Sequence, residues 1–291
     1  MQSLDPIPGP EAASPAEAAT SIAATTPIMV DGTPPPLPVH DPTKSVVDLV
    51  DVLLITLMTA GSFVFIGGAA AVIFMFAHRS EHLSSKAMAD ALAGNAFFVV
   101  PTQFVVYLAI LGFMSFLVWV RHRASLPQAI LWNVPARKVA LFAVAAGTGL
   151  ALFSDLGEIV LHSWIPKSLP ITDYFKDRPS ALLLAAFGIL IAPLMEEILF
   201  RGFLYPALAR WTGAAVSILL TASAFTLLHG AQLGYSWAPL LLIFVVGVVL
   251  TVTRAVTTSV ATCVLVHMAY NFVLLAQTYF ATQGFRQLQG S

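Results

Sequence analysis

Long apolar runs separated by short polar breaks make up the chain after residue 45. Each run has about 20 residues or more, the length that an α-helix needs to cross the hydrocarbon core of a bilayer. Strands would leave open sheet edges in lipid, so each run is interpreted as a helix. The predicted spans are 48–77, 97–120, 138–164, 180–204, 212–230, 237–254 and 258–281.

This pattern predicts an all-α fold, a polytopic transmembrane helical bundle of about seven spans, with eight as the alternative count. The third span is the least regular because Asp155 and Glu158 interrupt its apolar sequence. It could end early and continue as an interfacial helix. Residues 46–291 form the predicted transmembrane domain.

Residues 1–45 differ from the rest of the chain. They are rich in Pro, Ala, Ser and Thr and contain few large apolar side chains. Such a segment cannot bury enough surface to fold, so we predict a disordered N-terminal tail. The segment has neither the basic start nor the apolar core of a signal peptide, which predicts that it is retained.

Composition supports a membrane protein and narrows its partners. Hydrophobic residues make up 58% and charged residues 10% of the 291 positions, whereas soluble domains carry about 25% charged residues. A net charge of -1 without a basic run argues against a nucleic-acid partner. The single cysteine, Cys263, excludes an internal disulfide and a multi-cysteine metal site. The simple tail and the lack of an organelle signal favour an integral, multi-pass protein of a bacterial inner (plasma) membrane.

Ionisable residues inside a span are costly, so each one is a candidate for function. Glu196 and Glu197 are adjacent and therefore point about 100° apart on a helix. Glu197 and Arg201 are four positions apart with the acid first, the favoured order for an ion pair. We therefore expect Glu197 and Arg201 to support the structure, and Glu196 to be the reactive carboxylate. Pro193, just upstream, is suited to a kink that opens a cavity.

A histidine is predicted to lie at the depth of Glu196. The fourth and fifth spans should form an antiparallel hairpin that turns at Trp211-Thr212-Gly213. Glu196 and His229 lie at equal distances from this turn, on its two sides. A carboxylate and an imidazole at one depth could hold and deprotonate a water molecule between them.

The last span contributes His267 and Asn271, which are four positions apart and so share one helical face. An imidazole and a carboxamide aimed together could bind a developing oxyanion. Alternatively, His229, His267 and Glu196 could ligate a catalytic zinc ion with an open position. The helical His-Glu-x-x-His zinc motif is absent, however. The structural alternative is that His267 and Asn271 only form interhelical hydrogen bonds.

Together these residues form three motifs in a fixed order. The motifs are Glu196-Glu197-x-x-x-Arg201, Phe225-x-x-x-His229 and His267-x-x-x-Asn271, with Leu199-Phe-Arg-Gly-Phe-Leu-Tyr-Pro206 around the first. Their order and gaps resemble the CPBP family of CAAX-processing and bacteriocin-processing intramembrane proteases, which includes the Ras-converting CAAX endopeptidase. The resemblance covers residues 180–275 and puts a protease-like core at residues 180–281.

The resemblance implies an intramembrane endopeptidase with its active site inside the bundle. Glu196 and His229 would activate water, His267 and Asn271 would stabilise the oxyanion, and Phe225 would pack beside them. Family members are commonly labelled metalloproteases, but a metal-free glutamate mechanism is also proposed for them. The resemblance is therefore compatible with a divalent metal such as zinc and with a metal-free site. The substrate would be a membrane-associated protein or peptide, with lipidated CAAX proteins as the best-known class.

Two non-proteolytic functions also fit the residues. A membrane scaffold or immunity protein could keep the site geometry without turnover. A proton-coupled transporter could use Glu and His at the membrane midplane beside a Pro-kinked helix. The transporter interpretation predicts inverted repeats, and the sequence has none that we can recognise.

Overall fold

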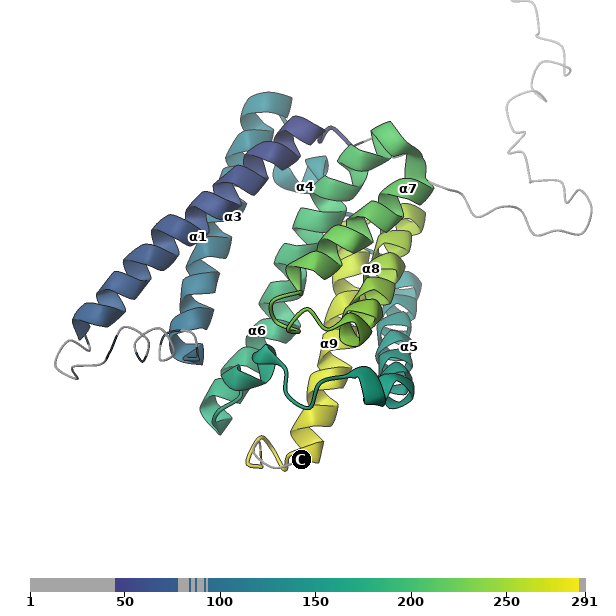
Figure 1. The fold of residues 1–291 in the computed structure, drawn as a ribbon. Helices are drawn as coiled ribbons and strands as arrows, with labels where there is room; N and C mark the ends of the chain where they lie inside the picture. The colour runs from purple at the N-terminus through teal and green to yellow at the C-terminus, as the bar shows by residue number, and fades with distance from the viewer. Residues whose placement is uncertain (1–44, 78–83, 85–86, 88–91, 93, 288–291) are drawn as a thin grey trace, which may run out of the picture. The chain divides into compact units, whose positions relative to one another are not determined.

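The computed structural model describes residues 45–77, 84, 87, 92 and 94–287, and the elements assigned within these ranges are all helical. The predicted tail, residues 1–45, lies outside the described residues apart from Ser45. Six helical stretches in the described ranges are long and apolar enough to cross a membrane. They are α1 (Leu49–Ala77), α3 (Ala96–His122), α5 (Arg137–Leu161), the continuous stretch Arg178–Leu228, α8 (Trp237–Thr257) and α9 (Val260–Ala281) (Figure 1). The predicted all-α, multi-pass fold is confirmed.

The long stretch contains the fourth and fifth predicted spans. It consists of α6 (Arg178–Glu197), the π-helix η5 (Ile198–Leu204) and α7 (Tyr205–Leu228). Inside α7, Gly213 has the non-helical dihedrals φ 75° and ψ 171°. Phe200 and Phe225, on opposite sides of Gly213, contact each other with ring centroids 5.2 Å apart. The chain therefore doubles back at the predicted turn, and the two spans form a hairpin.

The third span does not end early. Helix α5 continues past Asp155 and Glu158 to Leu161 and is followed by a short 3-10 helix, η3 (His162–Trp164). Two other short elements lie in the connections between spans. They are α4 (Leu126–Ala129) and the 3-10 helix η4 (Pro170–Tyr174).

Short polar side chains begin three of the spans. Asn95 accepts a hydrogen bond from a backbone N–H at the start of α3, and Asp177 does the same for α6. Ser259 accepts the backbone N–H of Thr262 at the start of α9, at 3.1 Å. The first N–H groups of a helix have no intrahelical acceptor, so these caps satisfy donors that would be costly to leave unpaired.

Glycine permits two close helix crossings. A Cβ atom at Gly147 of α5 would lie 2.2 Å from the carbonyl oxygen of Val266 in α9. A Cβ atom at Gly247 of α8 would lie 3.1 Å from the Cα of Ala222 in α7. Small residues of this kind let transmembrane helices approach closely enough for van der Waals packing. The crossings join α5 to α9 and α7 to α8, and these four helices are seen together in Figure 1.

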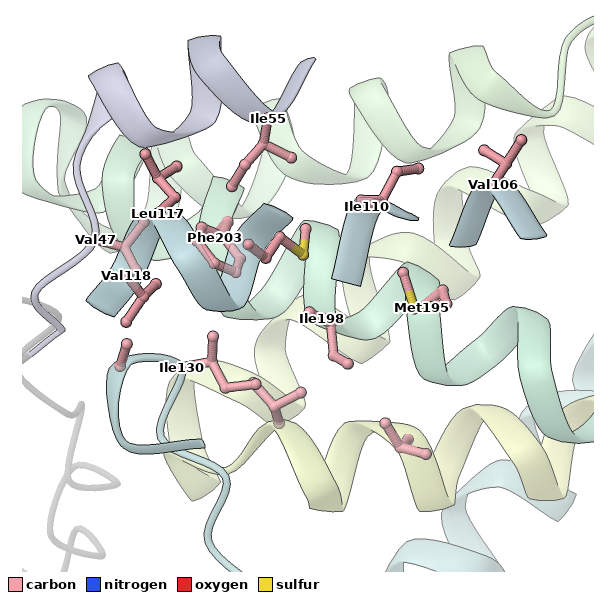
Figure 2. Packing of buried hydrophobic residues seen from close by; sticks show 14 residues of the cluster. Val47, Ile55, Val106, Ile110, Leu117, Val118, Ile130, Met195, Ile198 and Phe203 are labelled. Atoms are coloured by element: carbon pink, nitrogen blue, oxygen red, sulfur yellow. The ribbon is translucent and has the colours of Figure 1, made fainter. Parts of the chain in front are cut away.

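Two clusters of buried apolar side chains meet at the motif residues. The first cluster joins α1, α3, α6, η5 and α9 and includes Met195 and Phe203 (Figure 2). The second joins α5, α8 and α9 and includes Val266. Glu196 directly follows Met195, and His267 directly follows Val266. Packing of Met195 and Val266 therefore fixes the backbone directly beside Glu196 and His267.

Candidate active site

The first motif lies where α6 passes into a π-helix. Pro193, inside α6, has no backbone N–H to donate. Helix α6 ends at Glu197, and the wider turns of η5 follow and carry Arg201. Segments of π-helix are rare and occur frequently at functional sites.

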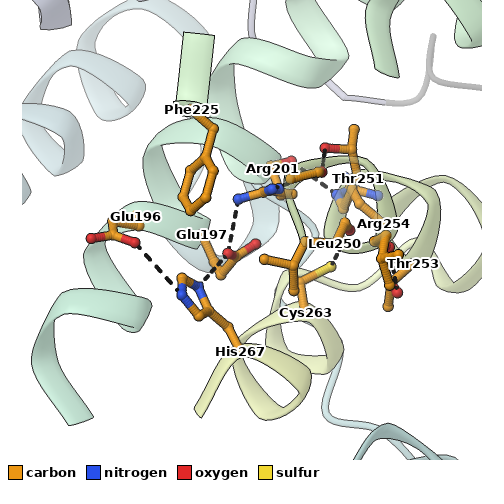
Figure 3. Close-up of polar contacts among 12 residues, drawn as sticks. Glu196, Glu197, Arg201, Phe225, Leu250, Thr251, Thr253, Arg254, Cys263 and His267 are labelled. Atoms are coloured by element: carbon orange, nitrogen blue, oxygen red, sulfur yellow. Dashed lines mark hydrogen bonds and ion pairs between the residues drawn. The ribbon is translucent and has the colours of Figure 1, made fainter. Parts of the chain in front are cut away.

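Glu197 is the centre of a buried hydrogen-bonded network. Its Oε1 accepts a hydrogen bond from Arg201 Nη1 at 2.9 Å and another from His267 Nδ1 at 2.8 Å (Figure 3). The side chains of Glu197 and Arg201 are fully buried, and that of His267 is 5% exposed. The ion pair expected from the spacing is present, but Glu197 also touches the histidine of the third motif. Glu197 therefore contacts the third motif as well as Arg201.

Glu196 lies on the other side of the same imidazole. Its Oε2 is 3.8 Å from His267 Nε2, and its side chain is 22% exposed. Figure 3 shows the imidazole between the two carboxylates, with Glu197 at Nδ1 and Glu196 at Nε2. The two adjacent acids therefore have different environments, as their directions on the helix require.

His229 bonds to the backbone of its own motif and not to Glu196. Its Nδ1 lies 2.9 Å from the carbonyl oxygen of Phe225, which can only accept, so Nδ1 carries the proton. The Phe225 ring lies 4.6 Å from the ring of His229 and 5.9 Å from that of His267, measured between centroids. No hydrogen bond or ion pair joins Glu196 to His229 within the part of the chain that the structure describes. The imidazole that contacts Glu196 directly is His267.

Asn271 bonds to the backbone of a neighbouring helix. Its Nδ2 donates to the carbonyl oxygen of Gly188 in α6 at 2.7 Å. This bond is of the interhelical kind that joins transmembrane helices. It leaves the amide oxygen and the second N–H hydrogen of Asn271 for other partners.

The predicted metal ligands do not gather in this arrangement. No group of three His, Cys, Asp or Glu side chains that could hold a metal ion exists among the described residues. His267 uses Nδ1 for Glu197, and His229 uses Nδ1 for a backbone carbonyl. Such bonds commonly orient metal-binding imidazoles, but the set His229, His267 and Glu196 does not fit a metal here.

Two residues of α8, Gly247 and Arg254, lie outside the three motifs and bond to Arg201. Arg201 Nη2 donates to the carbonyl oxygen of Gly247 in α8 at 3.0 Å. Arg254, also in α8 and only 3% exposed, donates from Nε to the carbonyl oxygen of Arg201 at 3.0 Å. The predicted break between the last two spans begins directly after Arg254, so the charge of Arg254 resembles one that flanks a span. Its position in the last turn of an otherwise apolar helix, where a charge is costly, is the signal that could have identified it.

A comparison with protein families identifies this part of the chain. Residues 178–273 match the family model described as Type II CAAX prenyl endopeptidase Rce1-like. No curated protein and no solved structure matches the chain. The matched segment begins at α6, ends in α9 and contains all three motifs. Together with the spanning helices, this match supports a multi-pass membrane protein of a protease family. The resemblance inferred from the motifs is thus confirmed by a match of residues 178–273 to the Rce1-like CAAX prenyl endopeptidase model.

Proposed function

We propose that the chain is an intramembrane endopeptidase that hydrolyses a peptide bond of a membrane-associated protein or peptide, with Glu196 as general base. The observation that carries this proposal is the imidazole of His267, held between the buried Glu197 and the partly exposed Glu196. The family match of residues 178–273 supports protease activity in general.

The charges of the network favour this assignment. With His267 protonated, the two positive charges of His267 and Arg201 balance the two carboxylates of Glu196 and Glu197. A balanced set of charges is less costly to bury than a net charge, because each ion loses its hydration on burial. Glu197 shares its charge between two donors, whereas Glu196 is the acid with an exposed edge. Glu196 is therefore the carboxylate that a substrate water can reach.

The reaction begins when Glu196 takes a proton from water as the water oxygen bonds to the scissile carbonyl carbon. His229 has its proton on Nδ1, so its Nε2 lone pair can accept the second water hydrogen and orient the molecule. The carbonyl oxygen becomes an oxyanion, and the protonated His267 offsets its charge by donating from Nε2. Asn271 would donate its remaining amide hydrogen to the same oxygen.

The tetrahedral intermediate then breaks down. Glu196 returns its proton to the amide nitrogen, the C–N bond breaks, and the products are a new carboxyl group and a new amine. Arg201 and Glu197 do not touch the reacting atoms in this scheme. They set the orientation of His267, because Nδ1 is bonded to Glu197 and only Nε2 faces the reaction.

The substrate we propose is a protein or peptide that carries a prenylated CAAX end. The site is surrounded by membrane-spanning helices, so a lipidated chain can bring its scissile bond to the right depth. Small peptides and bacteriocin precursors are the alternative substrates. A bacterial inner membrane remains our prediction for the location.

The test is cleavage of a quenched prenylated CAAX peptide by purified protein in lipid nanodiscs. Replacing Glu196→Gln removes the base and should lower turnover by about 100- to 10,000-fold. Glu158→Gln is the matched control, because Glu158 is an exposed acid of α5 outside the network. Equal turnover by wild type and the Glu196 variant would overturn the proposed mechanism. The same peptide without the prenyl group tests the lipid requirement, and a chelator tests metal dependence.

The transporter alternative has its own measurement. Proton flux into liposomes that depends on Glu196, without peptide cleavage, would favour a proton-coupled pathway. Function in cells that survives Glu196→Gln would favour a scaffold.

A further inference from the structure

We propose that Arg254 is a positioning residue for the hydrolysis, acting through the π-helix that carries Arg201. This inference rests on the proposed function, because the reaction it serves is the one assigned to Glu196. Arg254 does not contact Glu196, Glu197 or His267 through any bond found among the described residues. Its effect on them passes through the backbone of η5.

The backbone of η5 leaves one carbonyl without a helical donor. In a π-helix, the carbonyl of Arg201 would accept from residue 206, which is Pro206 and has no N–H. The α-helical alternative donor is the N–H of Tyr205, but that group donates to the carbonyl of Phe200. A buried carbonyl without a partner is costly, so a donor from outside the helix is needed.

Arg254 supplies that donor. Its Nε donates to the carbonyl oxygen of Arg201 at 3.0 Å (Figure 3). The guanidinium is almost completely buried, and no carboxylate pairs with it in the described ranges of the chain. Its charge is instead placed at the C-terminal end of α8, where the helix dipole favours a cation. Both hydrogen bonds of Arg254 go to backbone carbonyls, so its guanidinium stabilises the backbone that it contacts.

A second bond joins Arg254 to the connection after α4. Its Nη2 lies 3.5 Å from the carbonyl oxygen of Ile130, at the limit of a hydrogen bond. The side chain of Ile130 packs against η5, where a Cβ atom at Gly202 would lie 3.1 Å from it. Arg254 and Ile130 thus both contact η5, at the neighbouring residues Arg201 and Gly202.

The path from this contact to the reacting groups is short. The carbonyl that Arg254 binds belongs to Arg201, whose guanidinium donates to Glu197. Glu197 in turn binds His267 Nδ1 and leaves Nε2 directed at Glu196. If η5 relaxes, Arg201 and Glu197 shift together, and the imidazole loses its alignment.

The test compares Arg254→Met, Arg254→Lys and the control Arg210→Met in nanodiscs. Arg210 is a suitable control because it also donates from its guanidinium to a backbone carbonyl, that of Ser45, but outside the network. We expect Arg254→Met to lower kcat by about 10- to 100-fold with little change in KM, as a small misplacement of catalytic groups does. Arg254→Lys keeps the charge and one donor, so it should recover part of kcat and keep the protein folded if methionine does not.

Hydrogen exchange gives a readout that does not need cleavage. Amides of residues 198–205 should exchange faster in Arg254→Met than in wild type, and Arg210→Met should leave them unchanged. The inference is overturned if exchange there is unaltered, if only KM changes, or if Arg210→Met lowers kcat equally. If the Glu196→Gln protein still cleaves, the proposed function fails first. Faster exchange would then keep the Arg254 contact with η5 but remove its role in the reaction.

Discussion

Replacement by glutamine should have different effects at the adjacent acids Glu196 and Glu197, lowering turnover at Glu196 and stability at Glu197. Glu197 is fully buried and accepts from Arg201 at 2.9 Å and from His267 at 2.8 Å. Glu197→Gln removes its charge and leaves the buried guanidinium without a carboxylate. Breaking one partner of a buried ion pair costs about 3–5 kcal/mol. The glutamine oxygen can still accept one neutral hydrogen bond, so we expect the lower part of that range.

Glu196→Gln should have little effect on stability. Its side chain is 22% exposed, and its contact with His267 is 3.8 Å long. A weak, partly solvated ion pair contributes below about 1 kcal/mol. We therefore expect Glu196→Gln to fold like wild type but to lose turnover, and Glu197→Gln to lose stability.

The assay is reversible unfolding of the two variants by sodium dodecyl sulfate in mixed micelles, followed by circular dichroism. A third variant, Glu197→Gln with Arg201→Met, completes a double-mutant cycle. Replacing both partners of a buried pair by groups without charge is often nearly neutral, so the double variant should regain part of the loss. Equal unfolding free energies for the two single variants, or a double variant whose loss is the sum of both, would contradict a buried Glu197–Arg201 ion pair.

Three further predictions concern the scaffold and the site. Gly147→Ala places a Cβ atom 2.2 Å from a backbone oxygen and should cost about 1–3 kcal/mol, whereas Gly149→Ala faces open space and should gain up to about 1 kcal/mol from helix propensity. The unfolding midpoints of the two should therefore move in opposite directions, and a shared sign contradicts the crossing. Burial raises the pKa of Asp48, but backbone N–H donors and Arg121 outweigh it, so the folded pKa lies below the unfolded value of 3.8. The Asp48 carboxylate therefore contributes to the free energy of unfolding above the unfolded pKa, and this contribution is lost as the pH falls through the folded pKa. Measuring the free energy of unfolding down to about pH 3 should show the loss. Asp48→Asn is the reference variant that lacks it. Asn271→Leu should cost about 1 kcal/mol of interhelical bonding and also lower kcat; a stability loss with unchanged kcat would leave Asn271 as a structural residue only.

Much of the fold follows from the apolar pattern because lipid permits few alternatives. Spanning runs must be helices to pair their own backbone groups, and their length is set by the bilayer. The turn at Gly213 was predictable from the break between two such runs, and the structure has a positive φ there. The Glu197–Arg201 pair was predictable because both residues share one helix, where spacing alone determines contact.

The choice of partners between helices was not predictable in this way. Equal distance from the turn at Gly213 gave Glu196 and His229 a similar depth, but depth does not specify how far a helix is rotated about its axis. The structure turns Glu196 toward His267 and leaves His229 bonded to Phe225. Periodicity identifies the face of each helix and leaves open which neighbour that face meets.

The π-helix and its arginine are the clearest products of tertiary structure. The three motifs could be identified from the sequence because each lies within one helix, where spacing determines which residues share a face. Whether Arg201 lies on an α-turn or a π-turn depends on packing against Ile130 and on the donor that Arg254 provides from another helix. A contact between residues so distant along the chain is decided by the whole bundle, since no local spacing relates them.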